Sequence, residues 1–154
     1  MTGLKVDGVS KVYKKKKALA PCSFQAMQGT CVVLCGGNGA GKSTLLQIIA
    51  GILSPSSGTI TINDKEISLD RKKYLTEIGF MPDDFHAQKT MTVKEFLHFY
   101  GSIRKVKKER VDDIIDLIGL SDKRNELVKS LSKGMRQRLL FGQSIIAKPN
   151  VLLL

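Results

Sequence analysis

The pattern of hydrophobic and polar positions predicts a strand-rich first part of the chain. Residues 4–13 and 18–24 alternate weakly, as expected of two short strands, and the four lysines at 14–17 predict a hairpin loop between them. The unbroken apolar run CVVLC at 31–35 is typical of a strand buried on both faces. A helix over residues 42–50, apolar nearly all round, is predicted to end at Gly51, before another strand over 59–62.

The second half of the chain predicts three helices between two short strands. The first strand covers residues 78–81 and ends at Pro82, and the second covers 151–154 and is expected to be buried. The inward faces of the helices are expected to carry Val93, Phe96, Leu97 and Tyr100, then Val111, Ile114, Ile115 and Ile118, and then Met135, Leu139 and Ile146. This order predicts an α/β fold with a largely parallel sheet and a helical insertion.

Length and composition indicate a single globular domain. The 154 residues suffice for one hydrophobic core. The sequence contains no run of 18 apolar residues that could span a membrane, and its start lacks the apolar stretch of a signal peptide. We therefore expect a cytoplasmic chain. Three cysteines without a CxxC pair argue against a disulfide framework or a zinc site. We interpret Cys22, Cys31 and Cys35 as structural, with the last two packed as small hydrophobic residues.

The net charge of +11 favours contact with nucleic acid, an anionic membrane surface or anionic ligands. The lysine run at 14–17 has no interleaved aromatic residues after Tyr13 and lies between two strands, which favours a basic turn. We therefore expect no nucleic-acid partner. An RNA- or ribosome-associated protein is the last-ranked alternative, and a salt-dependent affinity for RNA would support it.

One motif carries specific chemistry, the phosphate-binding pattern GxxxxGK[ST] at 36–43. Its residues are Gly36, Gly37, Asn38, Gly39, Ala40, Gly41, Lys42 and Ser43. Glycines let successive N–H groups point into one concavity, and a helix that begins near Lys42 aims its positive end at the same place. Lys42 is expected to bind the β- and γ-phosphates, the Ser43 hydroxyl to ligate Mg²⁺, and Thr44 to contact the α-phosphate.

Four stretches in chain order resemble the nucleotide-binding domain of ABC transporters. They are GNGAGKST at 37–44, VSKVY at 9–13, LSKGMRQR at 131–138 and the apolar run at 151–154. The resemblance implies a P-loop NTPase fold of the ABC type, with an N-terminal β-rich part, a P-loop core and a helical insertion over about residues 88–147. It implies one partial domain over 1–154, with MgATP as the bound species.

The resemblance also assigns roles outside the P-loop. Tyr13 matches the aromatic residue that stacks on adenine, although an aromatic residue at a strand end is the alternative. The signature residues Ser132, Lys133, Gly134 and Met135 match those that meet ATP held by the other subunit of a head-to-tail dimer. Ser132 can equally be an ordinary N-cap, and both roles are compatible.

Two positions depart from the family pattern. Lys133 stands where the family usually has glycine, which adds positive charge but is expected to crowd the dimer contact. Asp83 stands where the family places a glutamine that touches Mg²⁺. A carboxylate can still bind Mg²⁺, and PDDF at 82–85 resembles the drug and antibiotic exporter branch, but an acidic surface turn is the alternative.

The sequence stops at Leu154, directly before the family's Walker B aspartate, catalytic glutamate and switch histidine. We therefore expect a truncated chain with an incomplete core sheet, marginal stability or completion by another chain, and no catalytic residues of its own. The function that we favour is an ATP-binding subunit of an ABC exporter, peripheral at the inner face of the cell membrane through a separate membrane subunit. The alternative is a truncated, non-hydrolysing nucleotide-binding module that pairs with an intact homologue. The expected head-to-tail dimer forms with a second copy of the chain or with an intact homologue.

Overall fold

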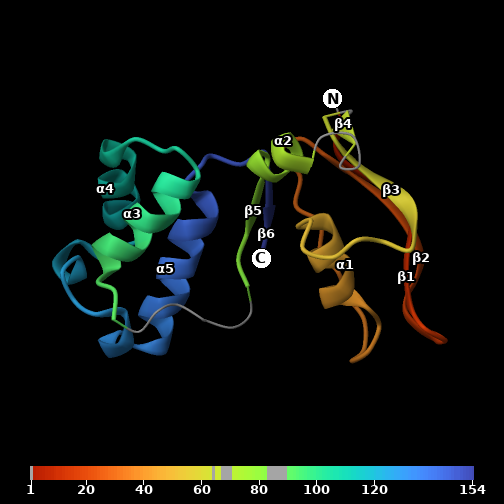
Figure 1. Cartoon of the computed structure of the whole chain (residues 1–154), viewed down its shortest axis with the longest axis horizontal. Coiled ribbons are helices and arrows are strands. Elements are labelled where there is room, and N and C mark those ends of the chain that lie inside the picture. The colour runs from red at the N-terminus through yellow and green to blue at the C-terminus, as the bar shows by residue number, and fades with distance from the viewer. Residues whose placement is uncertain (1, 64, 67–70, 83–89) are drawn as a thin grey trace. The chain divides into compact units, whose positions relative to one another are not determined.

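The computed structural model describes residues 2–63, 65–66, 71–82 and 90–154, and the chain divides into two compact units. The first unit ends at Ile78, with Leu153 added, and the second begins at Gly79. Each unit has its own secondary structure, and we describe them separately (Figure 1). None of the helices in the described ranges is long and apolar enough to cross a membrane.

The first unit is built on a four-stranded antiparallel sheet. Its strands are β1 (Thr2–Tyr13), β2 (Lys16–Met27), β3 (Ser57–Ile62) and β4 (Lys65–Glu66), in the order β2-β1-β3-β4. The predicted hairpin is confirmed, although its turn is only Lys14 and Lys15, because Lys16 already pairs with Tyr13. The prediction of a largely parallel sheet is wrong for these strands, because every pair of neighbours among them is antiparallel.

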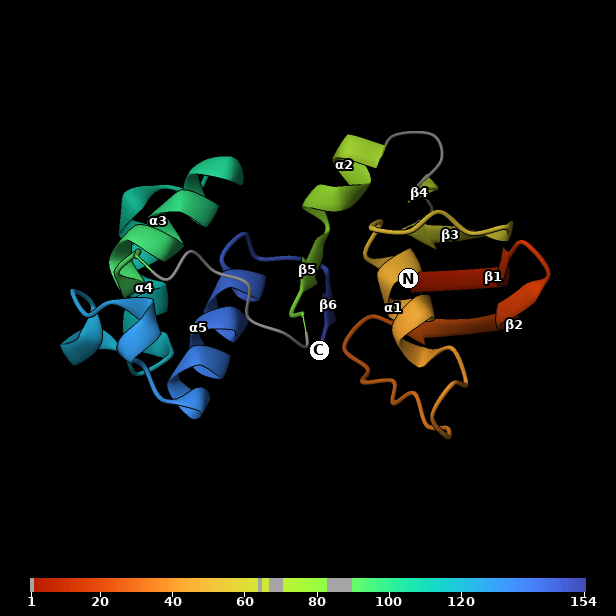
Figure 2. The ribbon, with the colours of Figure 1, turned by 60° about the horizontal axis from the view of Figure 1, so that its bottom comes forward.

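Two helices complete the first unit, α1 (Lys42–Ile49) and α2 (Arg71–Thr76). Figure 2 shows α1 lying against one face of the sheet, and β1 alternates buried and exposed positions accordingly. The buried apolar residues of this unit include Leu4, Val6, Val9, Leu19, Leu45, Ile48, Ile49, Ile60 and Ile62. The predicted helix over 42–50 is confirmed, and Gly51 follows it with a positive φ of 71°.

The apolar run at 31–35 forms no strand, so the prediction of a doubly buried strand there is wrong. Val33 is 75% exposed and Val32 is 45% exposed. Cys31 and Cys35 are also exposed free thiols, which contradicts their interpretation as packed hydrophobic residues, whereas Cys22 is half-buried. A strand is held by hydrogen bonds to its neighbours, and among the described residues this run has no such neighbour.

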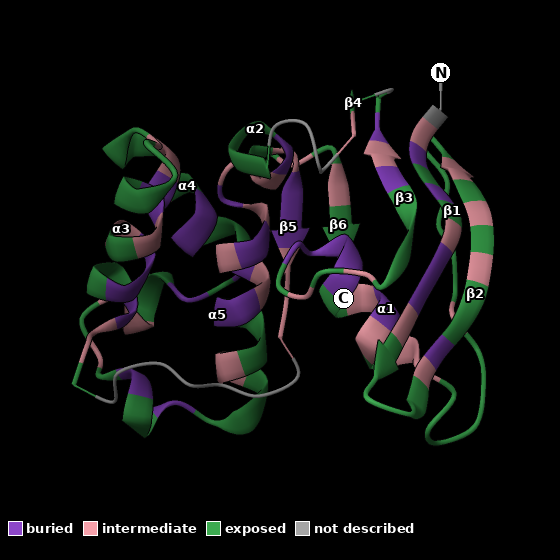
Figure 3. Ribbon diagram, turned by 45° about the vertical axis from the view of Figure 1, so that its right-hand side comes forward, coloured by how far each residue is buried: buried purple, intermediate pink, exposed green. Residues whose placement is uncertain are grey.

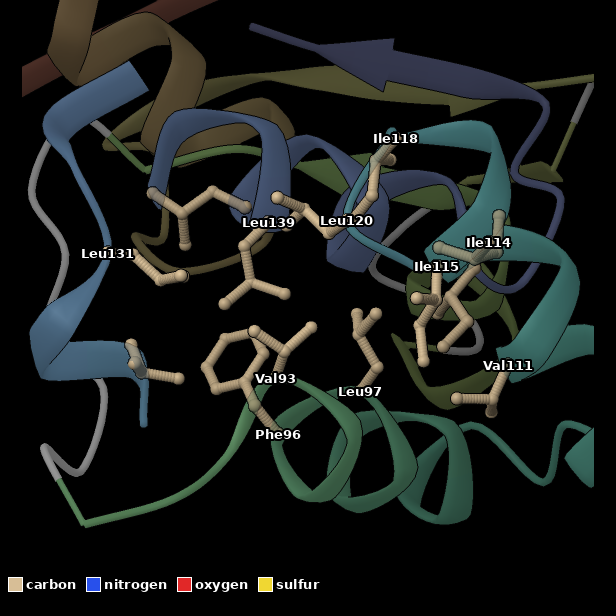
Figure 4. Packing of buried hydrophobic residues seen from close by; sticks show 13 residues of the cluster. Val93, Phe96, Leu97, Val111, Ile114, Ile115, Ile118, Leu120, Leu131 and Leu139 are labelled. Carbon is tan, nitrogen blue, oxygen red and sulfur yellow. The ribbon is translucent and has the colours of Figure 1, made fainter. Parts of the chain in front are cut away.

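The second unit is dominated by three helices, α3 (Val93–Ile103), α4 (Lys108–Leu117) and α5 (Lys133–Ile145). Two short 3-10 helices, η1 (Ser121–Lys123) and η2 (Val128–Ser130), connect α4 to α5. Side chains from all three helices point toward one another in a shared apolar core (Figure 4). The predicted inward faces are confirmed, except that Tyr100 and Met135 are only partly buried.

Strands β5 (Ile78–Phe80) and β6 (Val151–Leu153) pair in a separate two-stranded sheet. Gly79 needs its missing side chain, because a Cβ there would collide with the carbonyl oxygen of Ser144 in α5. The prediction of a buried strand at 151–154 is wrong in part. Leu153 is buried, but Leu152 is 38% exposed and Leu154 is 67% exposed (Figure 3).

Candidate nucleotide-binding site

The glycine-rich loop at 36–41 leads directly into α1. Ala40 N–H donates to the carbonyl of Gly37 at 3.2 Å, which closes a tight turn. Gly39 and Gly41 have φ values of 83° and 90°, in the left-handed region that favours glycine. The loop therefore takes the bent conformation that its sequence predicts.

Gly41 is also the point at which β2 approaches the loop. A Cβ at this position would lie 2.7 Å from the carbonyl oxygen of Ala18 and 3.0 Å from Cδ1 of Leu19. By contrast, no atom of the part of the chain that the structure describes lies within 4 Å of a Cβ placed on Gly37 or Gly39. Packing against β2 thus fixes the last glycine of the loop, while the middle of the loop stays open.

The Lys42 ammonium is folded back onto the loop. It donates hydrogen bonds to the carbonyl oxygens of Gly36 at 2.7 Å and Gly37 at 3.0 Å. These contacts hold a positive charge over the loop that would cradle phosphate. An incoming anion would compete for the same ammonium, which has three donors.

The first turn of α1 offers unpaired donors. Its N-cap is Gly41, which has no side chain to cap the helix, and the first bond into the helix is Leu45 N–H to the Gly41 carbonyl at 2.8 Å. In the described part of the chain, no hydrogen bond reaches the N–H groups of Lys42, Ser43 or Thr44. Unpaired N–H groups at a helix N-terminus are suited to bind a phosphate. The exposed Ser43 hydroxyl is suited to bind a divalent cation that accompanies the phosphate.

Tyr13 lies at the end of β1 and is 50% exposed. The Lys11 ammonium lies over its ring, 5.1 Å from the centroid, in a cation–π contact. Lys11 also donates to the Ser54 carbonyl at 2.6 Å, which holds the cation in place. A planar base would therefore have to use the other ring face or displace Lys11.

The signature residues open α5 in the second unit. Ser132 is the N-cap and its hydroxyl accepts from Met135 N–H at 3.2 Å, so its alternative role as an ordinary cap is present. Lys133 and Gly134 are exposed, and none of the described residues lies within 4 Å of a Cβ placed on Gly134. The packing of the described residues does not require glycine there.

Asp83, the expected magnesium ligand, lies outside the described residues. Within the ranges that are described, no group of three or more His, Cys, Asp or Glu side chains is arranged to hold a metal ion. The residues that fit MgATP are therefore those of the loop and of the first turn of α1. Their glycine conformations, open space and unpaired donors suit polyphosphate.

The sequence profile of the ABC transporter family matches residues 19–154. The chain belongs to the ABC transporter family. The ABC transporter ATP-binding protein YxlF of Bacillus subtilis is 36% identical over 155 residues, covering 98% of this chain and 51% of the relative. The linearmycin resistance ATP-binding protein LnrL of the same organism is 30% identical, covering 98% and 50%.

A solved structure supports the same fold. The cbiO1 protein of Clostridium perfringens, part of the ABC transporter complex cbiONQ, matches with a TM-score of 0.81 and 30% identity, covering 98% of this chain and 64% of that chain. The predicted P-loop NTPase fold of the ABC type is thus confirmed. This ABC family member spans about half the length of the Bacillus relatives that it matches.

Three features of the site were missed at the sequence level. They are the approach of Ala18 to Gly41, the contact of Lys11 with Tyr13, and the bonds from Lys42 to the loop carbonyls. Ala18 and Gly41 are far apart in the chain, so no local sequence pattern predicts their close approach. A lysine two residues before an exposed aromatic on a strand was the only available signal for the second.

Proposed function

We propose that this chain binds MgATP as part of the ATP-binding subunit of an ABC exporter, which works with a separate membrane subunit. The observation that carries the proposal is the open glycine loop at the uncapped N-terminus of α1, with Lys42 held over it. LnrL, a linearmycin resistance protein, supports the export assignment by its similarity. The expected location is the inner face of the cell membrane, reached through that partner.

The chain's own residues would act mainly by binding and orienting the nucleotide. Lys42 would exchange its two carbonyl acceptors for the β- and γ-phosphate oxygens, and the unpaired N–H groups of α1 would bind the same phosphates. The Ser43 hydroxyl oxygen would hold Mg²⁺, which would supply charge neutralisation at the phosphates when bound. Thr44 would contact the α-phosphate, and Tyr13 would stack on adenine.

The second unit would serve a nucleotide held by another subunit. The open space at Gly134 supports close approach by a partner, and the exposed Lys133 adds a cation next to it. Ser132 and Met135 complete this surface at the start of α5. The partner is a second copy of this chain or an intact homologue, arranged head to tail.

The test is MgATP binding by the purified chain beside Lys42→Ala, measured by calorimetry. Loss of charge-assisted hydrogen bonds of about 1.5–3 kcal/mol should weaken binding about tenfold to a hundredfold. Lys72→Ala, an exposed lysine in the same unit, is the matched control and should bind as the unmodified chain does. Equal affinities for all three proteins would refute the assignment of the P-loop.

Phosphate release in the same samples separates the two functional alternatives. Release that requires Lys42 favours an ATPase subunit, and binding without release favours the non-hydrolysing module that pairs with an intact homologue. Adding such a homologue should then restore release, if Ser132 to Met135 act on the partner's nucleotide.

A further inference from the structure

Four lysines precede Ala18, the residue of β2 that approaches the phosphate loop in the first unit. Lys14 and Lys15 form the turn of the β1–β2 hairpin, and Lys16 and Lys17 begin β2. All four are exposed, and none has an ion-pair partner among the residues that the structure describes. We call this group the basic turn.

Strand β2 connects the basic turn directly to the phosphate loop. Ala18 follows Lys17, and the carbonyl oxygen of Ala18 would lie 2.7 Å from a Cβ on Gly41. Gly41 is the N-cap of α1, the helix end at which an anion would bind. Lys17 is therefore one residue from a backbone contact with the site, and its long flexible stem lets the ammonium reach toward it.

The sequence that follows the basic turn contains no acidic residues to balance the charge of its four lysines until after Asn63. The segment from Gly8 to Asn63 runs from the middle of β1 through β2, the phosphate loop and α1 to the end of β3, and it contains six lysines but no Asp or Glu. The 14 acidic residues of the chain all lie outside it. Five of the six lysines lie within Lys11–Lys17, and the sixth is Lys42, so the positive charge of this segment is concentrated at the hairpin turn, with one cation at the phosphate loop.

We propose that the basic turn guides nucleotide polyphosphate to the loop, as a charge surface distinct from the phosphate contacts of Lys42. The inference rests on the proposed function, since the guided ligand is MgATP. Exposed charges act over a Debye length of about 10 Å at 0.1 M salt, so the basic turn can attract an anion before contact is made. Such steering raises the association rate more than it changes the dissociation rate.

A nucleotide is a better match to this placement than an extended polyanion. The four lysines occupy one end of one hairpin, and Ala18, the next residue of β2, is the one that approaches the phosphate loop. Nucleic acid or an anionic membrane would contact a wider basic face. The experiment below therefore measures how fast the nucleotide itself binds.

The test is stopped-flow association of a fluorescent ATP analogue with Mg²⁺, over a range of ionic strength. The variant changes Lys14, Lys15, Lys16 and Lys17 to Gln together. A control changes four exposed lysines of the helical unit to Gln, which removes the same net charge: Lys94, Lys105, Lys107 and Lys108. A third protein changes the basic turn to four arginines, which keeps its charge.

The Gln variant of the basic turn should associate about tenfold more slowly at low salt, with a shallower dependence of the rate on salt. Its rate should converge with that of the unmodified chain near 1 M salt, where the Debye length is about 3 Å. The helical-unit control and the Arg variant should keep the original rate and slope. An unchanged rate in the Gln variant, or an equal loss in the control, overturns the proposal while leaving MgATP binding intact. Absence of any Lys42-dependent binding in the unmodified chain would instead overturn the proposed function itself.

Discussion

Gly41 combines two physical demands that only glycine meets. Its φ of 90° lies in the left-handed region, and β2 packs so closely that a Cβ would lie 2.7 Å from the Ala18 carbonyl oxygen. Gly41→Ala should therefore lower the free energy of unfolding by about 1–3 kcal/mol. Urea unfolding measures this change.

Gly37→Ala is the control for that substitution in the same loop. Gly37 has no positive φ, and no atom of the described residues lies within 4 Å of a Cβ placed there, so its unfolding free energy should change by less than about 0.5 kcal/mol. If both variants unfold alike, close packing by β2 is not what fixes this loop.

The sequence predicted which residues form the loop, because the motif is local and its glycines have local conformational reasons. It could not predict where the Lys42 ammonium lies, since its acceptors are backbone carbonyls that converge only when the loop bends. It also could not predict that Cys31 and Cys35 are exposed. Their burial depends on neighbouring strands, and composition alone cannot specify these.

Helix α2 is attached to the end of α1 through one buried aromatic residue. Tyr74 is 2% exposed, and its hydroxyl donates to the carbonyl of Ile49, at the C-terminus of α1, at 2.8 Å. Arg71 makes a second bond from α2, to the carbonyl of Gly51. The first bond satisfies a carbonyl group that the last turn of α1 leaves unpaired, and the second satisfies a carbonyl of the residue that follows the C-cap Ala50.

Tyr74 should make the stability of the first unit depend on pH in alkaline solution. Burial raises the pKa of the Tyr74 hydroxyl well above its ordinary value of 10.0. The unfolded chain releases this proton near pH 10 while the folded chain retains it, so the contribution is constant below pH 10 and declines as the pH rises further. Loss of this one proton lowers the free energy of unfolding by at most about 1.4 kcal/mol per pH unit.

Tyr74→Phe isolates this effect from the titration of the lysines. It should cost about 1–2 kcal/mol at pH 8, because it leaves the Ile49 carbonyl unpaired. Between pH 9 and 11, the unfolding free energy of the unmodified chain should decline more than that of the variant. Parallel declines in urea unfolding would contradict the assignment of this pH dependence to Tyr74.

The elements that the sequence predicted well are those whose signal is local. Helices α3, α4 and α5 follow from apolar residues at helical spacing, and Gly119, with a φ of 65°, follows the C-cap of α4. Strand prediction was less reliable, because a strand requires a hydrogen-bonded neighbour as well as apolar side chains. Residues 31–35 have the composition of a strand but no strand neighbour among the described residues.

At the scale of the whole molecule, the chain contains two compact units, each with its own buried apolar residues. The apolar cluster of the second unit lies entirely within residues 93–146, and the sheet and α1 of the first unit bury their own set. Marginal stability of the chain is a prediction that these two small cores support, since a domain of about 60 residues buries only about 60% of its unfolded surface.

The helical unit should consequently fold without the first unit. A peptide of residues 90–150 contains the whole cluster and should unfold cooperatively on heating, as measured by circular dichroism at 222 nm. Phe96→Ala removes a side chain that is 2% exposed and should cost about 3–5 kcal/mol, which abolishes folding in so small a unit. Phe99→Ala, on the same helix but 48% exposed, should change the transition little. A peptide with no cooperative transition would show that the cluster needs the rest of the chain, and equal effects of the two substitutions would show that burial in this core does not decide stability.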